Sequence, residues 1–209
     1  MQLSVNRKRV LLVIDFFNPD GFRETPRFAK AALAAARRTA RLKEALRKRG
    51  VPTIYANDNF GRWQSEFGAL VGQCRELSGA AGEIATLLAP VPGDWSVLKP
   101  RHSAFYGTPL QFMLDELGAE TLILTGVSAD SCITMTAHDA HVRQFGVWTP
   151  RDCVASAELS YTRAALKHLK RVARAATLSS TALIAGGAEM PRGSRKRAAA
   201  TKPRRGRGS

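Results

Sequence analysis

The apolar run Val10-Leu-Leu-Val-Ile14 sets the first element of the fold. Five consecutive apolar residues ended by an aspartate are typical of a strand that is covered on both faces. From Phe28 to Leu46, apolar and small residues recur every three or four positions, which is the spacing of one helix face. Residues 51–56 form a second apolar run. This stretch therefore predicts a strand, a helix and a second strand parallel to the first.

The same alternation continues along the chain. Further strands are predicted over residues 95–98, 121–125, 147–149 and 177–184, and further helices over 65–77, 82–88, 108–118, 131–145 and 160–173. The start of the helix at 108 is the clearest, with Thr108 as N-cap, Pro109 at the first helical position and Gln111 three residues after the cap. The order predicts an α/β fold, a three-layer α/β/α sandwich with a mostly parallel, Rossmann-like sheet of six strands. Ligands of such folds bind beyond the carboxyl ends of the strands.

Charge is unevenly distributed along the 209 residues, which are enough for one domain with a substantial core. The formal net charge is +15, and eight of the 32 basic residues lie within residues 191–209, where no acidic residue occurs. We therefore predict a folded domain over residues 1–187 and a disordered basic tail over 188–209. The tail has three interpretations: a solvated extension without a partner, a non-specific nucleic-acid-binding segment, or a targeting signal.

Composition also bears on the compartment and on metal binding. No apolar run approaches the roughly 18 residues of a membrane span, and the first run is too short for an export signal. Cys74, Cys132 and Cys153 are widely spaced and odd in number, which indicates reduced thiols in the cytoplasm. His138 and His141 could share a helix face, but no third ligand is evident nearby. We expect a cytoplasmic protein with no membrane partner, no metal and no cofactor.

Three side chains capable of chemistry follow predicted strands at one edge of the sheet. Asp15 ends the first strand, Lys99 ends the strand over 95–98, and Cys132 begins the helix after the strand over 121–125. A helix N-terminus and an ammonium group both favour a thiolate, and a carboxylate can take the thiol proton and pass it to a leaving amine. Each residue also has a structural explanation when taken alone. Asp15 could be a turn residue, Lys99 a solvated lysine and Cys132 a buried thiol.

Local motifs around these residues favour the catalytic interpretation. The motifs are Val13-Ile-Asp-Phe-Phe-Asn18, Val97-Leu-Lys-Pro-Arg-His-Ser-Ala-Phe105 and Thr125-Gly-Val-Ser-Ala-Asp-Ser-Cys-Ile133. Over residues 8–185 the chain resembles the isochorismatase-like cysteine hydrolases, a superfamily of nicotinamidases, carbamoyl-amide hydrolases and isochorismatases. By this resemblance, Asp15, Lys99 and Cys132 match the Asp-Lys-Cys catalytic triad of the family, and residues 1–187 form its hydrolase domain.

The resemblance has two further implications. The family usually has a cis peptide just before the helix that carries the cysteine, here expected between Val127 and Ser128. Such a bond would turn the N–H groups of Ser128 and Cys132 toward one oxyanion, where a donor stabilises the transition state. Family members are commonly dimers or tetramers, so a homo-oligomer is expected.

The departures from the family pattern restrict the choice of substrate. Nicotinamidases carry a metal site built as Asp-x-His after the second strand, with a further histidine downstream. Here Asp58 is followed by Phe60, and no histidine precedes His102, so no metal is expected. True isochorismatases cleave a vinyl ether and generally lack the nucleophilic cysteine. Phe17 stands where many relatives have glutamine, so the pocket wall is expected to differ there.

Several polar and aromatic residues follow the strands at the same edge as the triad. With Phe17, the candidate substrate-binding residues are Asn59, Arg62, Trp63, His102 and Phe105. The alternative for the aromatic members and Arg62 is packing in the core or across a subunit interface, and His102 could be an ordinary loop histidine. The residue pattern does not decide between these interpretations.

The leading functional prediction is a cysteine-dependent hydrolase that cleaves an amide or carbamoyl C–N bond of a small molecule through a thioester. Cys132 would attack the carbonyl carbon, Asp15 would accept and return the proton, and Lys99 would support the thiolate. One alternative is vinyl-ether hydrolysis with Cys132 as a bystander. The other is a nucleic-acid-associated protein that acts through residues 191–209.

Overall fold

The computed structural model describes residues 9–22 and 25–186. The predicted basic tail over residues 188–209, and the domain boundary before it, lie outside the described residues. Within the described part of the chain, no helix is both long enough and apolar enough to cross a bilayer.

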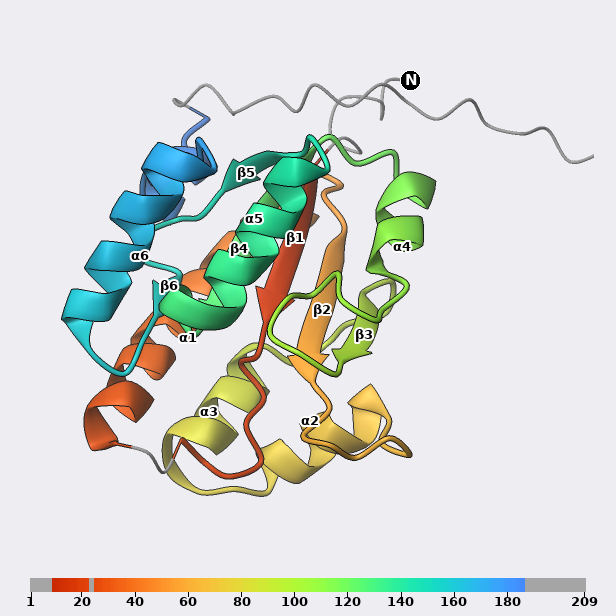
Figure 1. Cartoon of the computed structure of the whole chain (residues 1–209). Coiled ribbons are helices and arrows are strands. Elements are labelled where there is room, and N and C mark those ends of the chain that lie inside the picture. The colour runs from red at the N-terminus through yellow and green to blue at the C-terminus, as the bar shows by residue number, and fades with distance from the viewer. Residues whose placement is uncertain (1–8, 23–24, 187–209) are drawn as a thin grey trace, which may run out of the picture.

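The fold is built around one sheet of six strands in which every pair is parallel. The strands are β1 (Arg9–Ile14), β2 (Thr53–Asp58), β3 (Trp95–Lys99), β4 (Thr121–Val127), β5 (Gly146–Trp148) and β6 (Val154–Ala155). Their order is β3-β2-β1-β4-β5, and β6 pairs with the end of β4. The predicted α/β class with a six-stranded parallel sheet is confirmed, and β1 and β4 lie side by side at its centre (Figure 1).

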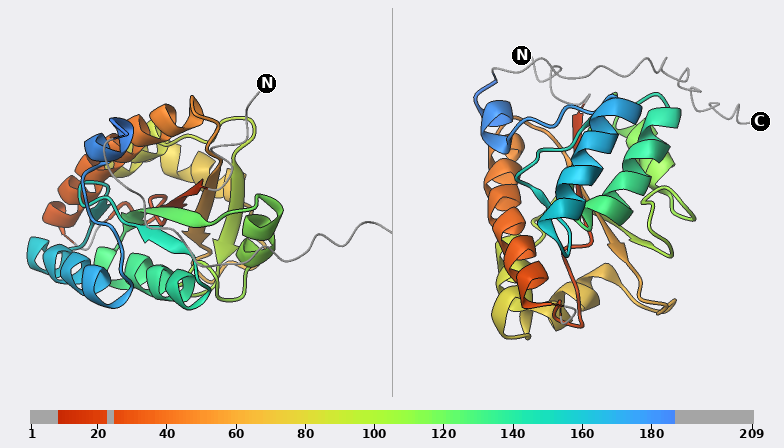
Figure 2. Two further views of the ribbon diagram at one scale, coloured as in Figure 1. Left: turned by 90° about the horizontal axis from the view of Figure 1, so that it is seen from above. Right: turned by 60° about the vertical axis from the view of Figure 1, so that its left-hand side comes forward.

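Helices cover both faces of this sheet, as the two views of Figure 2 show. The helices are α1 (Pro26–Arg47), α2 (Phe67–Arg75), α3 (Gly79–Leu87), α4 (Leu110–Glu116), α5 (Thr134–Val142), α6 (Leu159–Val172) and α7 (Ser180–Ile184), with a π-helix, η1 (Ala129–Ile133), before α5. One apolar cluster joins the sheet to α1, α2, α3 and α7, and a second joins it to α4, α5 and α6.

The two clusters explain the continuous apolar run in β1. Leu11 and Val13 belong to the cluster under α1, whereas Val10, Leu12 and Ile14 belong to the cluster under α4, α5 and α6. Successive side chains of a strand point to opposite faces, so a strand covered on both sides needs apolar residues at every position.

The prediction of a last strand over residues 177–184 is wrong. This segment forms α7, whose first turn is capped by the Ser179 hydroxyl, which accepts from the N–H of Ala182 at 3.4 Å. The Asp152 carboxylate also accepts from the N–H and the hydroxyl of Ser180, both at 2.7 Å. These polar contacts favour a helical turn over a strand at this position. The sixth strand is instead β6, which has only two residues and shows no periodicity in the sequence.

Two helix boundaries also differ from the prediction. The helix expected over 131–145 consists of η1 followed by α5. The helix expected from 108 begins at Leu110, and the Thr108 hydroxyl accepts from the N–H of Leu110 at 3.2 Å. Gln111 does not close a capping box, because its amide donates to Asp115 along the helix at 3.2 Å.

The close approach of β1 and β4 depends on a glycine. Ile14 pairs with Gly126, which has a φ of 136°. Residues that carry a side chain rarely adopt this backbone conformation. A Cβ atom at this position would lie 1.9 Å from the Ile14 carbonyl oxygen. Gly126 therefore allows the two strands that lead into the candidate site to pack against each other.

We expect Gly126→Ala to destabilise the protein by about 3 kcal/mol or more, because the new methyl group overlaps backbone atoms of a central strand. Gly118→Ala is the matched control, since Gly118 also has positive φ but a Cβ there meets nothing within 4 Å. The control should cost only about 1 kcal/mol. Equal free energies of unfolding for the two variants in urea titrations would contradict this account.

Candidate active site

The candidate site lies at the carboxyl ends of four neighbouring strands. Asp15 follows β1, Asp58 ends β2, Lys99 ends β3, and Cys132 lies in η1 after β4. Asp58 and Lys99 are paired in register across β2 and β3. Parallel strands bring their carboxyl ends to one edge of the sheet, so residues more than a hundred positions apart meet there.

Lys99 is the centre of this site. Its side chain is 0% exposed, and its ammonium lies 2.7 Å from Asp15 Oδ2 and 3.7 Å from Asp58 Oδ2. The ammonium also donates to the Arg101 carbonyl oxygen at 3.1 Å and lies 3.7 Å from Cys132 Sγ. A buried ammonium needs such partners, because an unpaired buried charge is costly. The predicted convergence of Asp15, Lys99 and Cys132 is therefore present in the geometry.

Asp15 is held in a strained backbone conformation directly after β1. Its φ is 52°, which is uncommon for a residue with a side chain and is often found at functional sites. Its N–H donates to the Ala56 carbonyl at 3.2 Å, and its Oδ1 accepts from the N–H of Asp58 at 2.7 Å. Burial raises the pKa of Asp15, although Lys99 and the hydrogen bonds act in the opposite direction. The carboxylate is thus a stronger base than an exposed aspartate.

Cys132 lies in η1, the π-helical turn between β4 and α5. Two polar contacts hold this turn: the Ser156 hydroxyl donates to Asp130 Oδ1 at 2.5 Å, and the Thr134 hydroxyl donates to the Ala129 carbonyl at 2.7 Å. Single π-helical turns are rare and occur frequently at functional sites. The turn positions the thiol toward Lys99 and Asp15.

The thiol of Cys132 keeps its proton near neutral pH. Burial and the neighbouring Asp15 raise its pKa to about 12, whereas Lys99 and a hydrogen bond from Ser131 lower it by less. Lys99 thus acts on the thiol in the expected direction, and burial opposes it. Asp15, hydrogen-bonded to the thiol, is the group available to accept its proton.

The peptide bond between Val127 and Ser128 is cis, as the resemblance implies. The carbonyl of Ser128 accepts from the N–H groups of Ser131 and Ile133, both at 3.2 Å. Ser128 is the residue immediately before η1, and Cys132 lies within it. The use of the N–H groups of Ser128 and Cys132 for an oxyanion stays a prediction.

His102 is the predicted pocket residue that reaches the triad. Its Nδ1 lies 3.7 Å from Cys132 Sγ and 3.2 Å from the Ser131 hydroxyl oxygen. It also borders a cavity of about 590 Å3 that is lined by Arg101, His102, Ser103, Tyr106, Met135, His138, Asp139 and Val142. The cavity lies between α5 and the loop after β3, and His102 is the residue of its lining that contacts the Cys132 sulfur.

Phe17 and Phe105 do not fit the predicted role in substrate binding. Phe17 is 1% exposed and packs edge-on against Phe67 at 5.4 Å between ring centroids. Phe105 is 6% exposed, and the Arg143 guanidinium lies over its ring at 4.7 Å. Both rings are buried in the core. Core packing was the alternative interpretation of the aromatic residues that follow the strands.

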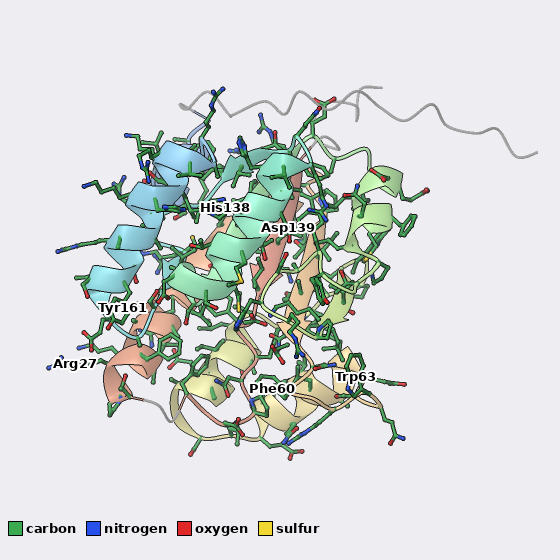
Figure 3. The ribbon with its side chains drawn as sticks, in the orientation of Figure 1. Arg27, Phe60, Trp63, His138, Asp139 and Tyr161 are labelled. Carbon is green, nitrogen blue, oxygen red and sulfur yellow. The ribbon has the colours of Figure 1, made fainter. Side chains whose placement is uncertain are left out.

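Asn59, Arg62 and Trp63 lie on the loop after β2 and do not line the cavity beside His102. The side chain of Asn59 accepts from the N–H of Gly61 at 2.9 Å, so it shapes the turn. Arg62 donates to Gln73 on α2 at 3.2 Å. Trp63 is 79% exposed, and Figure 3 shows it at the end of the molecule away from His138.

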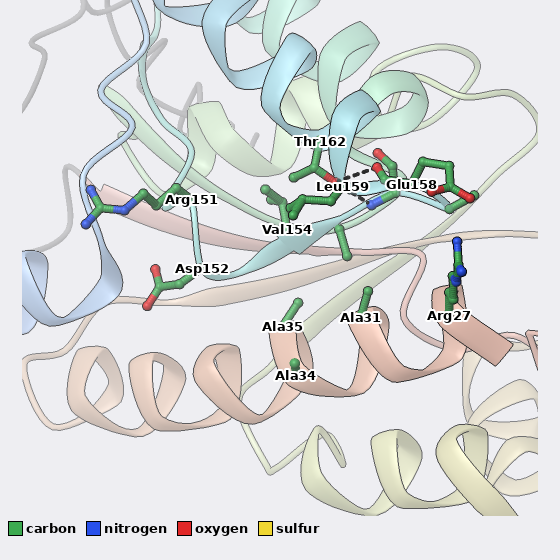
Figure 4. A pocket seen from close by; sticks show the side chains of 13 residues that line it. Arg27, Ala31, Ala34, Ala35, Arg151, Asp152, Val154, Glu158, Leu159 and Thr162 are labelled. Carbon is green, nitrogen blue, oxygen red and sulfur yellow. Dashed lines mark hydrogen bonds between the residues drawn. The ribbon is translucent and has the colours of Figure 1, made fainter.

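A second cavity of about 450 Å3 lies between α1 and the segment from β6 to α6 (Figure 4). Its lining includes three alanines of α1, together with Arg27, Arg151 and Glu158. Cys132, Lys99 and Asp15 do not contribute to it, so it is separate from the triad.

The residues at the family's metal position have other partners. Asp58 Oδ1 accepts from the N–H of Phe60 at 2.7 Å, and its Oδ2 faces Lys99. Among the described residues, no group of three His, Cys, Asp or Glu side chains could hold a metal ion. The side chains present therefore do not fit a nicotinamidase-type metal site.

Comparison with known proteins agrees with this geometry. The model of the isochorismatase domain family matches residues 9–182. The chain belongs to the isochorismatase family of hydrolases.

Individual relatives of this hydrolase differ in how much of the chain they match. The uncharacterized isochorismatase family protein YaaI of Bacillus subtilis is 35% identical over 148 residues, 71% of this chain and 81% of that protein. Ureidoacrylate amidohydrolase RutB of Methylorubrum extorquens is 43% identical over 58 residues, 28% of this chain and 23% of that protein. The crystal structure of N-carbamoylsarcosine amidase from Thermoplasma acidophilum superposes with a TM-score of 0.63 at 26% identity, covering 83% of this chain and 96% of that one.

Two residues that were not predicted as part of the triad or the pocket also shape the site. Asp58 positions Asp15 through its backbone N–H and approaches Lys99 with its carboxylate. Asn57, which is 0% exposed, holds the chain after β1 by accepting from the N–H of Phe17 at 3.1 Å and donating to its carbonyl at 2.9 Å. A polar pair ending an otherwise apolar strand was the signal for both.

We expect Asp15→Asn to speed the alkylation of Cys132 by iodoacetamide at pH 8. Removing the carboxylate removes a charge and a hydrogen bond that raise the thiol pKa, and each pKa unit lost increases the thiolate fraction about tenfold. Peptide mapping gives the rate for Cys132 relative to the fully buried Cys74 and Cys153, which should react slowly in both proteins.

Asp58→Asn is the matched control for this experiment. Its carboxylate also faces Lys99 but at 3.7 Å, and its effect on Cys132 should be smaller. Slower alkylation in Asp15→Asn than in the unmodified protein would show that Asp15 does not hold the thiol in its protonated form.

Proposed function

We propose that this isochorismatase-family hydrolase cleaves the C–N bond of a small amide or carbamoyl compound through a thioester on Cys132. The observation that carries the proposal is the contact of one buried ammonium, Lys99, with both the Asp15 carboxylate and the Cys132 sulfur. A thiol, a base and a fixed positive charge are the parts that acyl transfer requires.

The first half of the reaction forms the acyl-enzyme. The Cys132 proton moves to Asp15 as the sulfur attacks the carbonyl carbon, so that a C–S bond forms and the carbonyl π electrons move to oxygen. The resulting oxyanion is bound by the N–H groups of Ser128 and Cys132, whose donation is stronger in the transition state than in the ground state. When the intermediate collapses, the C–N bond breaks and the amine takes the proton from Asp15.

The second half releases the acid. Asp15 takes a proton from water, which attacks the thioester carbon through a second oxyanion. The C–S bond then breaks, and the proton on Asp15 returns to the sulfur, which restores the resting thiol. Asp15 alternates between base and acid in both halves, and a raised pKa suits both roles because it lies closer to neutral pH.

Lys99 serves this cycle as a positioning and electrostatic group. It stabilises the thiolate that exists only during attack, when the sulfur has lost its proton. Its buried contacts with Asp15 and the Arg101 carbonyl fix its location. The substrate approaches through the cavity beside His102, whose Nδ1 is within 3.7 Å of the nucleophile.

The relatives support an amide substrate. RutB is named for ureidoacrylate and the structural relative for N-carbamoylsarcosine, and both names describe cleavage of a carbamoyl nitrogen compound. Vinyl-ether hydrolysis is the second candidate, and in that reaction Cys132 is a bystander. The two candidates therefore differ in their dependence on the thiol.

We expect Cys132→Ala to reduce ammonia release at least about 1,000-fold across a panel of N-carbamoyl amino acids, ureidoacrylate and simple primary amides, because the nucleophile is lost. Cys74→Ala is the control that removes a thiol away from the site. Mass spectrometry of the active protein under substrate should show the acyl adduct on the peptide that contains Cys132. Cleavage of isochorismate that is unchanged in Cys132→Ala would favour the vinyl-ether candidate instead.

The pH profile gives an independent check. Asp15 must be unprotonated to accept the thiol proton, so kcat/KM should fall as pH drops through the pKa of Asp15. Because that pKa is raised by burial, the acid limb should have its midpoint above the ordinary value of about 3.9 for aspartate. Thermal unfolding over the same pH range separates this limb from loss of structure. A constant kcat/KM down to pH 4 in a folded protein would contradict the assignment of Asp15 as the base.

A further inference from the structure

A pair of histidines joins the two helices on one face of the sheet, apart from the triad. His138 lies on α5 and His168 on α6, and their Nε2 atoms form a hydrogen bond at 3.0 Å. The ring centroids are 5.0 Å apart with the planes inclined at 66°. Thirty residues separate the two in sequence, so the pair exists only because α5 and α6 pack side by side (Figure 1).

The pair is accessible from solvent. His168 is exposed and His138 is partly exposed, and Figure 3 shows His138 at α5 on the side of α6. The neighbouring Asp139 is engaged elsewhere, since its carboxylate accepts from the Ser103 hydroxyl and the Arg143 guanidinium. An ion that binds both rings would replace their mutual hydrogen bond and would meet two imidazole nitrogens.

The spacing of the two Nε2 atoms matches that of two ligands on one transition-metal ion. With bonds of about 2.0–2.1 Å, two nitrogens lie about 2.9 Å apart on a square-planar ion and about 3.3 Å apart on a tetrahedral one. The observed 3.0 Å lies between these values. We propose that His138 and His168 form a binding site for a divalent transition-metal ion.

The donor set defines the class of ion. Neutral imidazoles suit Cu2+, Ni2+ and Zn2+, and the affinity of a nitrogen site for these ions follows the order in which Cu2+ binds most tightly. No third His, Cys, Asp or Glu completes the site within the part of the chain that the structure describes. The remaining coordination positions are therefore open to water or to an external ligand.

The location of the site gives metal binding a structural consequence. Both α5 and α6 contact η1, the turn that carries Cys132. His138 also borders the cavity that leads to His102. An ion held by one ligand from each helix would link the two helices that support the nucleophile, and it would stabilise the folded state in proportion to its occupancy.

Titration of the full chain, without an affinity tag, with NiCl2 in a calorimeter tests the proposal. We expect saturable binding of one Ni2+ per chain and a melting temperature that rises with Ni2+ concentration. His138→Ala and His168→Ala should each weaken the affinity at least tenfold, because each removes half of the protein ligands. His141→Ala is the matched control, one helical turn from His138, and should remain within twofold of the unmodified protein.

Two further measurements decide between this site and other groups on the chain. Cys132→Ala should bind Ni2+ as tightly as the unmodified protein, since the Cys132 and His102 pair is not part of the site. Circular dichroism should show that the histidine variants are folded, as expected for substitutions at exposed or partly exposed positions. The proposal is overturned if saturable binding is absent, if the three histidine variants behave alike, or if Cys132→Ala abolishes binding.

Discussion

The buried ammonium of Lys99 is the interaction on which the site depends. A fully buried cation requires compensating partners, and here they come from three separate segments: Asp15 after β1, Asp58 at the end of β2, and the Arg101 carbonyl after β3. Pairing the Lys99 ammonium with these three oxygen atoms therefore fixes the relative positions of the strand ends. Cys132 is placed next to this group by η1, so the nucleophile and its charge partner are positioned by one network.

The same burial sets the protonation states. Desolvation raises the pKa of Cys132 to about 12 and also raises that of Asp15, so the resting site contains a thiol and a strengthened base. In the proposed reaction, the thiolate is generated only when the proton moves to Asp15, and Lys99 stabilises the charge that appears during attack.

Some residues around the triad are buried in the core, and others border a cavity. Phe17 and Phe105 are core residues that support the strand ends, whereas His102 lies at the boundary between the thiol and the cavity along α5. His138 borders that cavity from the other side and pairs with His168. The cavity and the histidine pair thus both depend on the packing of α5.

The amino-acid sequence determined most of the strand and helix order and placed Asp15, Lys99 and Cys132 at one edge of the sheet. Continuous apolar runs reflect burial on both faces of a sheet, and the motifs around Asp15, Lys99 and Cys132 are local. It did not determine β6 or α7, because a two-residue strand has no periodicity and α7 depends on hydrogen bonds from Asp152, 28 residues away. It also could not separate Phe105, a core residue, from His102, which reaches the thiol, because that distinction depends on which side chains face each other across elements. The protonation state of Cys132 and the approach of His138 to His168 were decided by tertiary structure alone, since desolvation and contact between helices arise only when distant segments pack together.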